Sequence, residues 1–221
     1  MISLFVLFAC SGSAPPTPAA EPTPVAETTP PADPPADAPV PSEGVAEAAE
    51  PTTTGFRLTS PDFAAGASMP THLTCEGDDT SPALVWHDAP EGTKSFALIV
   101  TDPDAPDPAR PRMTWVHWVV YDIPFQTTGL AAGAAATGMP EGSREGTNDF
   151  RKTGYGGPCP PTGRHRYVHT VYALDTVLGD QGALARVPLG QAMEGHILGE
   201  AELIGTYEKA TPDPGTPRSG R

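Results

Sequence analysis

Positive charge is scarce in this sequence. Its 221 residues include 13 Lys and Arg against 27 Asp and Glu, which gives a formal net charge of −14. Residues 1–55 contain no base and seven of the acids, so this segment carries half of the net charge. A chain without clustered Lys and Arg residues lacks the positive surface that binds the phosphate backbone of a nucleic acid. We therefore expect no nucleic-acid partner.

Long apolar runs are also missing. No stretch approaches the roughly 18 apolar residues that a membrane-spanning helix needs. A short apolar run at residues 2–9 stops at Cys10, as at the end of a secretory signal. Residues 7–10 also resemble the bacterial lipoprotein box, in which the cysteine is lipid-modified. We expect residues 1–10 to be a truncated lipoprotein signal ending at lipidated Cys10; the alternative is an ordinary cysteine in an apolar N-terminus.

Aromatic and branched aliphatic residues are nearly absent from residues 11–55, which are rich in Pro, Ala, Thr and Glu. Such a segment cannot bury enough surface to offset the entropy of ordering. We expect a disordered tether over 11–55, one folded domain over 56–208 and a disordered tail over 209–221. A proline-rich ligand for another module is the alternative for the tether. The lipid anchor predicts a bacterial cell-envelope location, facing the periplasm or the exterior, with membrane contact through the anchor only.

The remaining sequence is dominated by strand signals. Three long β-branched runs bounded by Gly, Pro and Asp predict strands at residues 94–102, 115–121 and 166–174. Shorter candidate strands are residues 56–58, 69–74, 83–86 and 200–207. A cluster of good helix formers after Pro188 predicts a helix near residues 189–198. The fold class is therefore mainly β, with one or two peripheral helices.

Alternation along the strands assigns side chains to faces. On one face of the third long strand we expect His165, Tyr167, His169 and Val171. On one face of the second long strand we expect Trp115, His117, Val119 and Tyr121. Asp102 and Asp104 close the first long strand, where sites are commonly built. His169 is expected to be a packed strand residue rather than a ligand.

Three segments together carry a family resemblance. They are residues 102–106 (DPDAP), 115–120 (WVHWVV) and 156–167 (GGPCPPTGRHRY). From residue 56 to 208 the chain resembles the phosphatidylethanolamine-binding protein family, and more closely its bacterial Raf-kinase-inhibitor-like branch. The resemblance implies a Greek-key β-sandwich with a small cavity that binds anionic head groups such as phosphate or phosphoethanolamine.

The family motifs assign the ligand-binding residues. By position they are Asp102, Asp104, His117, Gly157, Pro160, Pro161, His165 and Tyr167. We expect the two acids to orient the two histidines and raise their pKa, which leaves ring N–H groups for the anion. Gly156 and Gly157 are expected to present backbone N–H groups in a nest. Arg166 is expected to face away from the pocket and form a structural ion pair.

The sequence has only three cysteines. If Cys10 is lipid-modified, Cys75 and Cys159 remain as an even pair in an oxidising compartment. A disulfide between them would close a loop of about 85 residues and stabilise the fold by about 4–5 kcal/mol in the chain-entropy model. The alternatives are two buried thiols, or Cys159 as a thiol of the pocket.

Other chemistries have weaker support in the sequence. Two His and two Asp are a workable zinc or iron set, but no H-E-x-x-H helix accompanies them and the family implies no required metal. No G-x-S-x-G occurs to supply a hydrolase nucleophile, and no glycine-rich nucleotide loop occurs. We expect no cofactor, no metal and no enzyme activity.

The expected function is a non-enzymatic binding module for small phosphate-type anions, held on a membrane. A regulator that inhibits a protease or kinase through the pocket rim, as some family members do, is the first alternative. A hydrolase or metal-dependent enzyme is the second. The bacterial branch is known to dimerise, so a homodimer is a further arrangement to consider, although no surface stripe predicts one.

Overall fold

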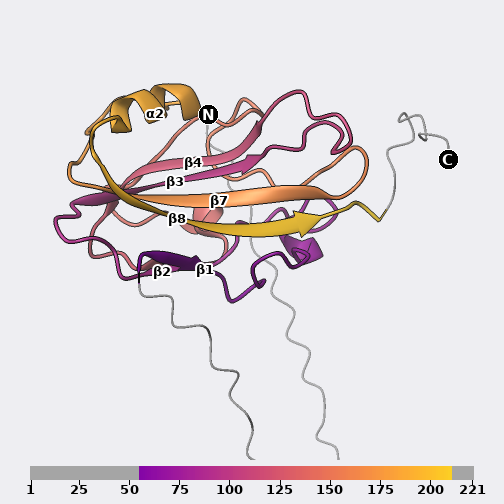
Figure 1. The fold of residues 1–221 in the computed structure, drawn as a ribbon, viewed down its shortest axis with the longest axis horizontal. Coiled ribbons are helices and arrows are strands. Elements are labelled where there is room, and N and C mark those ends of the chain that lie inside the picture. Colours follow the sequence, from indigo (N-terminus) through magenta and orange to yellow (C-terminus); the bar gives the residue numbers. More distant parts are fainter. Residues whose placement is uncertain (1–54, 211–221) are drawn as a thin grey trace, which may run out of the picture. The chain divides into compact units, whose positions relative to one another are not determined.

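The structure, a computed structural model, describes residues 55–210, so the predictions for the signal, for Cys10, for residues 11–54 and for 211–221 lie outside it. The described residues form two antiparallel sheets (Figure 1). The smaller has the order β1-β2-β5, with bounds Arg57–Thr59, Leu84–His87 and Gly129–Leu130. The larger has the order β6-β4-β3-β7-β8, with bounds Arg144–Glu145, Trp115–Pro124, Ser95–Asp102, His165–Leu174 and Ile197–Tyr207.

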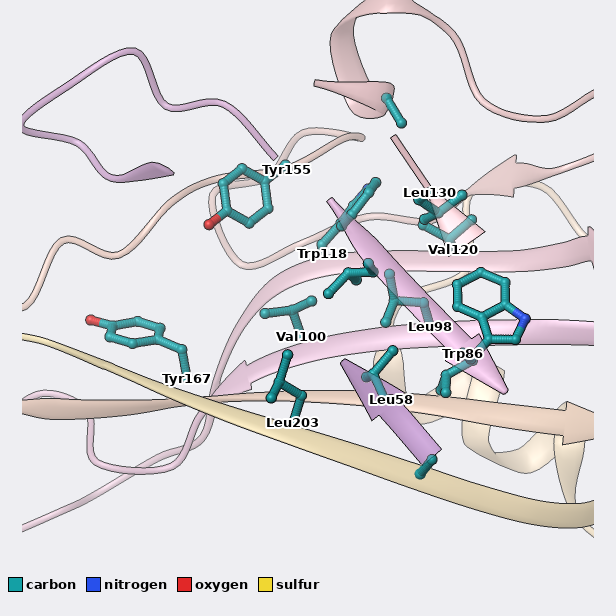
Figure 2. Close-up of a cluster of buried hydrophobic side chains, with 14 of the residues drawn as sticks. Leu58, Trp86, Leu98, Val100, Trp118, Val120, Leu130, Tyr155, Tyr167 and Leu203 are labelled. Carbon is teal, nitrogen blue, oxygen red and sulfur yellow. The ribbon is translucent and has the colours of Figure 1, made fainter. Parts of the chain in front are cut away.

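The two sheets face each other across the main hydrophobic core (Figure 2). Leu58 and Trp86 from the smaller sheet meet Leu98, Val100 and Val120 from the larger one. On the other face of β3, Ala97 and Ile99 belong to a second cluster. Helix α2 (Arg186–Met193) covers that cluster (Figure 1). The sequence prediction of a mainly β sandwich with few helices is confirmed.

The three long strand predictions are confirmed, but two local predictions are wrong. Residues 69–74 contain a 3-10 turn, η1 (Thr71–Leu73), in place of a strand. Thr74 donates to the Thr71 carbonyl through both its backbone N–H and its hydroxyl, at 2.9 Å each, which closes the turn. The predicted helix at 189–198 is displaced: α2 ends at Met193 and β8 begins at Ile197. Gly195 lies between them with φ 79°, a conformation that glycine adopts readily.

A β-bulge in β4 overturns the predicted face of His117. In the register with β3, Val100 pairs with Trp118 and Thr101 pairs with Val116, so His117 is the extra residue. Val119 therefore lies in the cluster under α2, while the ring of His117 lies 5.2 Å from that of Tyr167. The bulge turns His117 toward the end of the sheet where the loops gather.

The other helix is short: α1 covers Ala134–Thr137. Among residues 55–210, no helix has both the length and the apolar character that crossing a bilayer requires.

Candidate ligand-binding site

A cavity of about 450 Å³ lies where β3 ends and where β4 and β7 begin. These strand ends are at the right-hand end of the large sheet in Figure 1. It is lined by Asp102, Ala105, Pro106, Arg112, Met113, Trp115, His117, Phe150, Cys159, Pro160 and Pro161. Four of the predicted site residues are in this set: Asp102, His117, Pro160 and Pro161. The other four, Asp104, Gly157, His165 and Tyr167, lie behind the lining.

Asp102 is the buried carboxylate of the cavity, and it pairs with His165. The Asp102 Oδ2 atom lies 2.7 Å from His165 Nδ1, and Oδ1 accepts the backbone N–H of Asp104 at 2.8 Å. His165 Nε2 donates to the Thr162 carbonyl at 3.0 Å. Burial opposes a charge on His165, but the hydrogen bond and charge of Asp102 outweigh it and raise the pKa. Both ring N–H groups are thus already used, contrary to the expectation that one points at the ligand.

Asp104 orients Arg166 and not a histidine. Its carboxylate accepts the backbone N–H and Nε of Arg166, each at 2.9 Å, and Nη2 at 2.7 Å. The Arg166 hydrogen bond is the main reason why the pKa of Asp104 is lowered, against the opposing effect of burial. The expected structural ion pair of Arg166 is confirmed. The expected role of Asp104 as a histidine partner is wrong, because the arginine occupies both carboxylate oxygens.

His117 offers one ring nitrogen to the cavity. Its Nδ1–H donates to the Gly156 carbonyl at 2.5 Å, and no hydrogen bond to Nε2 is found among residues 55–210. Burial lowers the pKa of His117, although the Gly156 carbonyl and the charge of Asp102 act in the opposite direction. The prediction of a raised pKa is therefore wrong for this histidine. The neutral ring presents Nε2 as an acceptor, and protonation would convert it to a donor.

The glycine pair positions the wall of the cavity but does not form an anion nest. The N–H of Gly156 donates to the His117 carbonyl at 3.0 Å, and that of Gly157 donates to Asp79 Oδ1. Both donors are therefore occupied, and the predicted nest is wrong. A Cβ on Gly156 would lie 2.6 Å from the Phe150 ring. The absence of side chains at this pair thus allows Phe150 to reach the lining.

Tyr167 supports His117 from behind the cavity. Its side chain is 1% exposed and belongs to the main core. The two rings meet edge to face, with an interplanar angle of 80°. The hydroxyl of Tyr167 is buried without a hydrogen-bond partner in the described part of the chain. Tyr167 therefore acts on the site through the position of His117. His169, expected to be a packed strand residue, is fully buried against Phe63.

Arg112 is the lining residue that sequence reasoning missed. It is exposed, and its guanidinium makes no ion pair or hydrogen bond within residues 55–210. Its backbone N–H donates to the Ala105 carbonyl at 2.9 Å, which folds the loop after β3 back over the cavity. The available signal was the pair of bases, Arg110 and Arg112, between the DPDAP and WVHWVV segments.

A disulfide joins Cys75 to Cys159, with a Cα–Cα distance of 5.4 Å. The sequence prediction of this pair is confirmed, and the alternative of two buried thiols is wrong because both residues are exposed. The backbone N–H of Cys75 also donates to the Pro158 carbonyl at 3.1 Å. The bond therefore anchors the cavity wall at Cys159 to the segment that follows η1.

The described residues contain no group of three or more His, Cys, Asp or Glu side chains arranged to hold a metal ion. The two histidines and two aspartates of the metal alternative are instead divided between a His–Asp pair, an Asp–Arg pair and a single cavity histidine.

A β-sandwich with a cavity at one end is the architecture of a ligand-binding protein. The profile of the phosphatidylethanolamine-binding protein family matches residues 59–208, and the chain belongs to this family.

Its relatives include proteins of an archaeon and of a bacterium. The chain is 46% identical over 142 residues to a UPF0098 protein of Methanothermobacter thermautotrophicus, covering 64% of this chain and 91% of the relative. It is 45% identical over 155 residues to a UPF0098 protein of Chlamydia pneumoniae, covering 70% of this chain and all of the relative.

Two solved structures share the fold over most of the domain. The putative family homologue CT736 from Chlamydia trachomatis aligns with a TM-score of 0.65 and 41% identity, over 71% of this chain and 99% of that protein. YbcL of E. coli, described as a member of the mammalian family, aligns with a TM-score of 0.64 and 37% identity, over 70% and 98% of the two chains.

Proposed function

We propose that this protein is a non-enzymatic binding module for small phosphate-type anions, including phosphoethanolamine, held at a bacterial envelope membrane by its N-terminal segment. The observation that carries the ligand proposal is the guanidinium of Arg112, which lines the cavity without a counter-charge. The membrane tether rests on Cys10 and on the composition of residues 11–55.

The charge balance of the cavity supports an anionic ligand. The carboxylate of Asp102 is balanced by His165 when that ring is protonated, and the carboxylate of Asp104 is balanced by Arg166. Burial favours the neutral form of His117. Arg112 is therefore the uncompensated charge of the lining, and a guanidinium matches the geometry of a phosphate through two parallel hydrogen bonds.

A zwitterion fits the same groups. Each oxygen of Asp102 accepts one hydrogen bond in the structure, and a carboxylate oxygen can accept a second. An ammonium group of the ligand could donate to Asp102 while its phosphate binds Arg112. Protonated His117 would supply a further donor at Nε2. This arrangement supports phosphoethanolamine-type ligands over bare cations.

The lining also supports binding over catalysis. It contains no hydroxyl or ammonium nucleophile among the described residues, and the sulfur of Cys159 is bonded to Cys75. A covalent mechanism needs a nucleophile beside a base.

Titration with O-phosphorylethanolamine and with inorganic phosphate, followed by calorimetry and by NMR of His117, tests the proposal. Arg112→Gln should weaken binding by at least tenfold, since a charge-assisted hydrogen bond of about 1.5–3 kcal/mol is lost. Arg110→Gln is the matched control, because Arg110 is exposed in the same loop but is not in the lining. A wild-type protein without saturable change, or equal affinities of the two variants, would overturn the proposal.

A further inference from the structure

A second cavity, of about 400 Å³, lies beside α1. Its lining comes from residues 78–81, from the turn 132–137 that carries α1, and from residues 153–155. This lining shares no residue with that of the cavity at the end of the large sheet, the end cavity. The volume lies within the range of roughly 300–1,000 Å³ that is usual for small-molecule sites. Three segments far apart in the chain thus enclose a space that the proposed anion site does not use.

Hydrogen bonds hold the walls of the second cavity in place. The backbone N–H of Gly133 donates to the Ser81 carbonyl at 2.8 Å, which joins the α1 turn to the loop before β2. The Tyr155 hydroxyl donates to the Leu73 carbonyl at 3.0 Å and fixes the third segment. A site whose walls are fixed before binding loses little conformational entropy when a ligand enters. The second cavity is therefore preorganised.

Small side chains and hydroxyl groups make up most of the lining. Three alanines and two glycines leave the space open. The aliphatic hydroxyl groups belong to Thr80, Ser81, Thr137 and Thr153. Ser81 is only 2% exposed, and its Oγ accepts the backbone N–H of Ala135 at 3.3 Å, but its hydroxyl hydrogen has no acceptor among residues 55–210. Buried polar hydrogens are normally bonded, so this donor is available to a ligand.

The charge of the lining is negative. Asp78 and Asp79 are both exposed, and no base of the described residues belongs to the lining. Asp78 forms no ion pair within residues 55–210, whereas Asp79 Oδ2 lies 3.8 Å from Lys152 Nζ. The lysine stands outside the lining, and half of its side chain is exposed. Its position shows that an ammonium group can approach the Asp79 carboxylate.

Asp79 is held in one orientation by its backbone and by its other carboxylate oxygen. Its φ is 56°, a left-handed conformation that aspartate and asparagine adopt more readily than most residues. Its Oδ1 atom accepts the backbone N–H of Gly157. The carboxylate is therefore fixed, and Oδ2 is the oxygen that remains for a cation.

We propose that the second cavity binds a small organic ammonium compound that carries several hydroxyl groups, such as an amino sugar. The ammonium group would lie between Asp78 and Asp79 Oδ2. Charge-assisted hydrogen bonds of this kind are roughly twice as strong as neutral ones. A ligand hydroxyl would accept the free hydrogen of Ser81, and another would pair with Thr80. The proposal concerns the second cavity alone and does not depend on what the end cavity binds.

Other ligand classes use fewer of these groups. The two carboxylates repel an anion. A neutral sugar pairs with the hydroxyl groups but leaves both charges unused. A metal ion needs a tight cluster of ligands, and the described residues contain no group of three or more His, Cys, Asp or Glu side chains that would hold one. A hydroxylated ammonium compound uses the carboxylates and the hydroxyl groups together.

Calorimetric titration of the full chain with D-glucosamine tests the proposal. Glucose is the matched probe, because it has a hydroxyl group in place of the ammonium group. Glucosamine should bind saturably, and glucose should bind at least tenfold more weakly. In NMR spectra, the backbone amide signals of residues 78–81, 132–137 and 153–155 should shift. Arg112→Gln should leave the glucosamine affinity unchanged, since Arg112 lines the end cavity, so this test is separate from that of the anion site.

Asp79→Asn should weaken glucosamine binding about tenfold, as expected for the loss of a charge-assisted hydrogen bond. The variant should fold, because asparagine keeps an acceptor for the Gly157 N–H and tolerates the backbone conformation. Asp88→Asn is the matched control. Asp88 is also exposed, has a φ of 58° and pairs with a base, Arg57, but it does not belong to the lining. The control should bind glucosamine as the parent does.

Lys152→Gln gives a test of opposite sign. It removes the ammonium group that competes for Asp79, so glucosamine should bind severalfold more tightly. Absence of saturable glucosamine binding, equal affinities for glucosamine and glucose, an equal loss in Asp88→Asn, or amide shifts confined to the end cavity would each overturn the proposal. Calcium chloride that produces the expected amide shifts when glucosamine does not would assign the cavity to a metal ion and would also overturn it.

Discussion

His165 Nδ1 and Asp102 Oδ2 lie 2.7 Å apart in a buried pair, with Asp102 in the lining of the cavity and His165 behind it. The imidazole is fully buried, and the carboxylate is the only acidic group of the described lining. When His165 is protonated, this pair balances the negative charge of Asp102, and it would allow an acidic motif to coexist with the proposed anion site.

Asp102→Asn should therefore destabilise the fold. The variant leaves a buried histidine without its counter-charge, which typically costs about 3–5 kcal/mol. Because the folded-state pKa of His165 is raised above 6.5, the stabilisation from the pair is present below pH 6.5 and is lost as pH rises through the folded-state pKa. Urea unfolding across this range should show that loss in the wild type and not in Asp102→Asn. The exposed Asp78→Asn is the control; a similar effect there would contradict the prediction.

His169 should make the protein sensitive to acid. It is fully buried, and burial lowers its pKa to about 4. The folded-state pKa is below the ordinary value, so its stabilising contribution is present above pH 6.5 and is lost as pH falls toward about 4. The maximum loss is about 3 kcal/mol. In His169→Gln the free energy of unfolding should vary less over this range, whereas the exposed His87→Gln should behave as the wild type does.

Anion binding should become tighter in acid because of His117. An anion beside Nε2 stabilises the imidazolium, so binding is coupled to proton uptake by a group whose free pKa lies below 6.5. Sulfate is a suitable probe, since it remains a dianion across this range. Its affinity should rise as pH falls below neutrality in the wild type and stay level in His117→Gln. Identical pH profiles for the two proteins would refute a role for this ring.

Gly157→Ala should destabilise the fold by about 3 kcal/mol, as expected for a group forced into a packed site. The added Cβ would lie 2.5 Å from Asp79 Oδ1 and would also clash with the Leu73 carbonyl, a backbone atom that cannot move aside cheaply. Gly190→Ala is the matched control, since Gly190 lies in α2 with no atom near its Cβ position. That variant should be neutral or slightly stabilising. Thermal unfolding of both variants checks the contrast.

Removal of the disulfide should weaken both fold and site. Cys75→Ser with Cys159→Ser should lower stability by up to about 4–5 kcal/mol, the chain-entropy value for this loop. Phosphate affinity should also fall, because Cys159 lines the cavity and its neighbours Pro160 and Pro161 form the wall. Calorimetry of the wild type under oxidising and reducing conditions provides the same comparison without substitution. Equal affinities in both would show that the wall holds without the bond.

The long strands could be predicted because their apolar, β-branched runs are buried on both faces, as β3 shows. The turn at Thr71–Leu73 was missed because hydrogen bonds from the hydroxyl and backbone N–H of Thr74 to the Thr71 carbonyl hold it. The pattern of apolar residues in the sequence does not reveal such bonds. The bulge at His117 was missed for a different reason. A period-two pattern assumes an unbroken register, and only the pairing of β4 with β3 shows the extra residue.

By itself the sequence predicted the mainly β class from its strand signals. Its resemblance to a known family implied the sandwich and the residues that gather at one end of the sheet, and the number of cysteines favoured a Cys75–Cys159 bond over free thiols. Only the tertiary structure decided the partners: His165 with Asp102, Arg166 with Asp104, and Arg112 without a counter-charge. Charge pairing depends on distances of a few ångströms between residues far apart in the chain, and the order of the residues does not encode those distances directly.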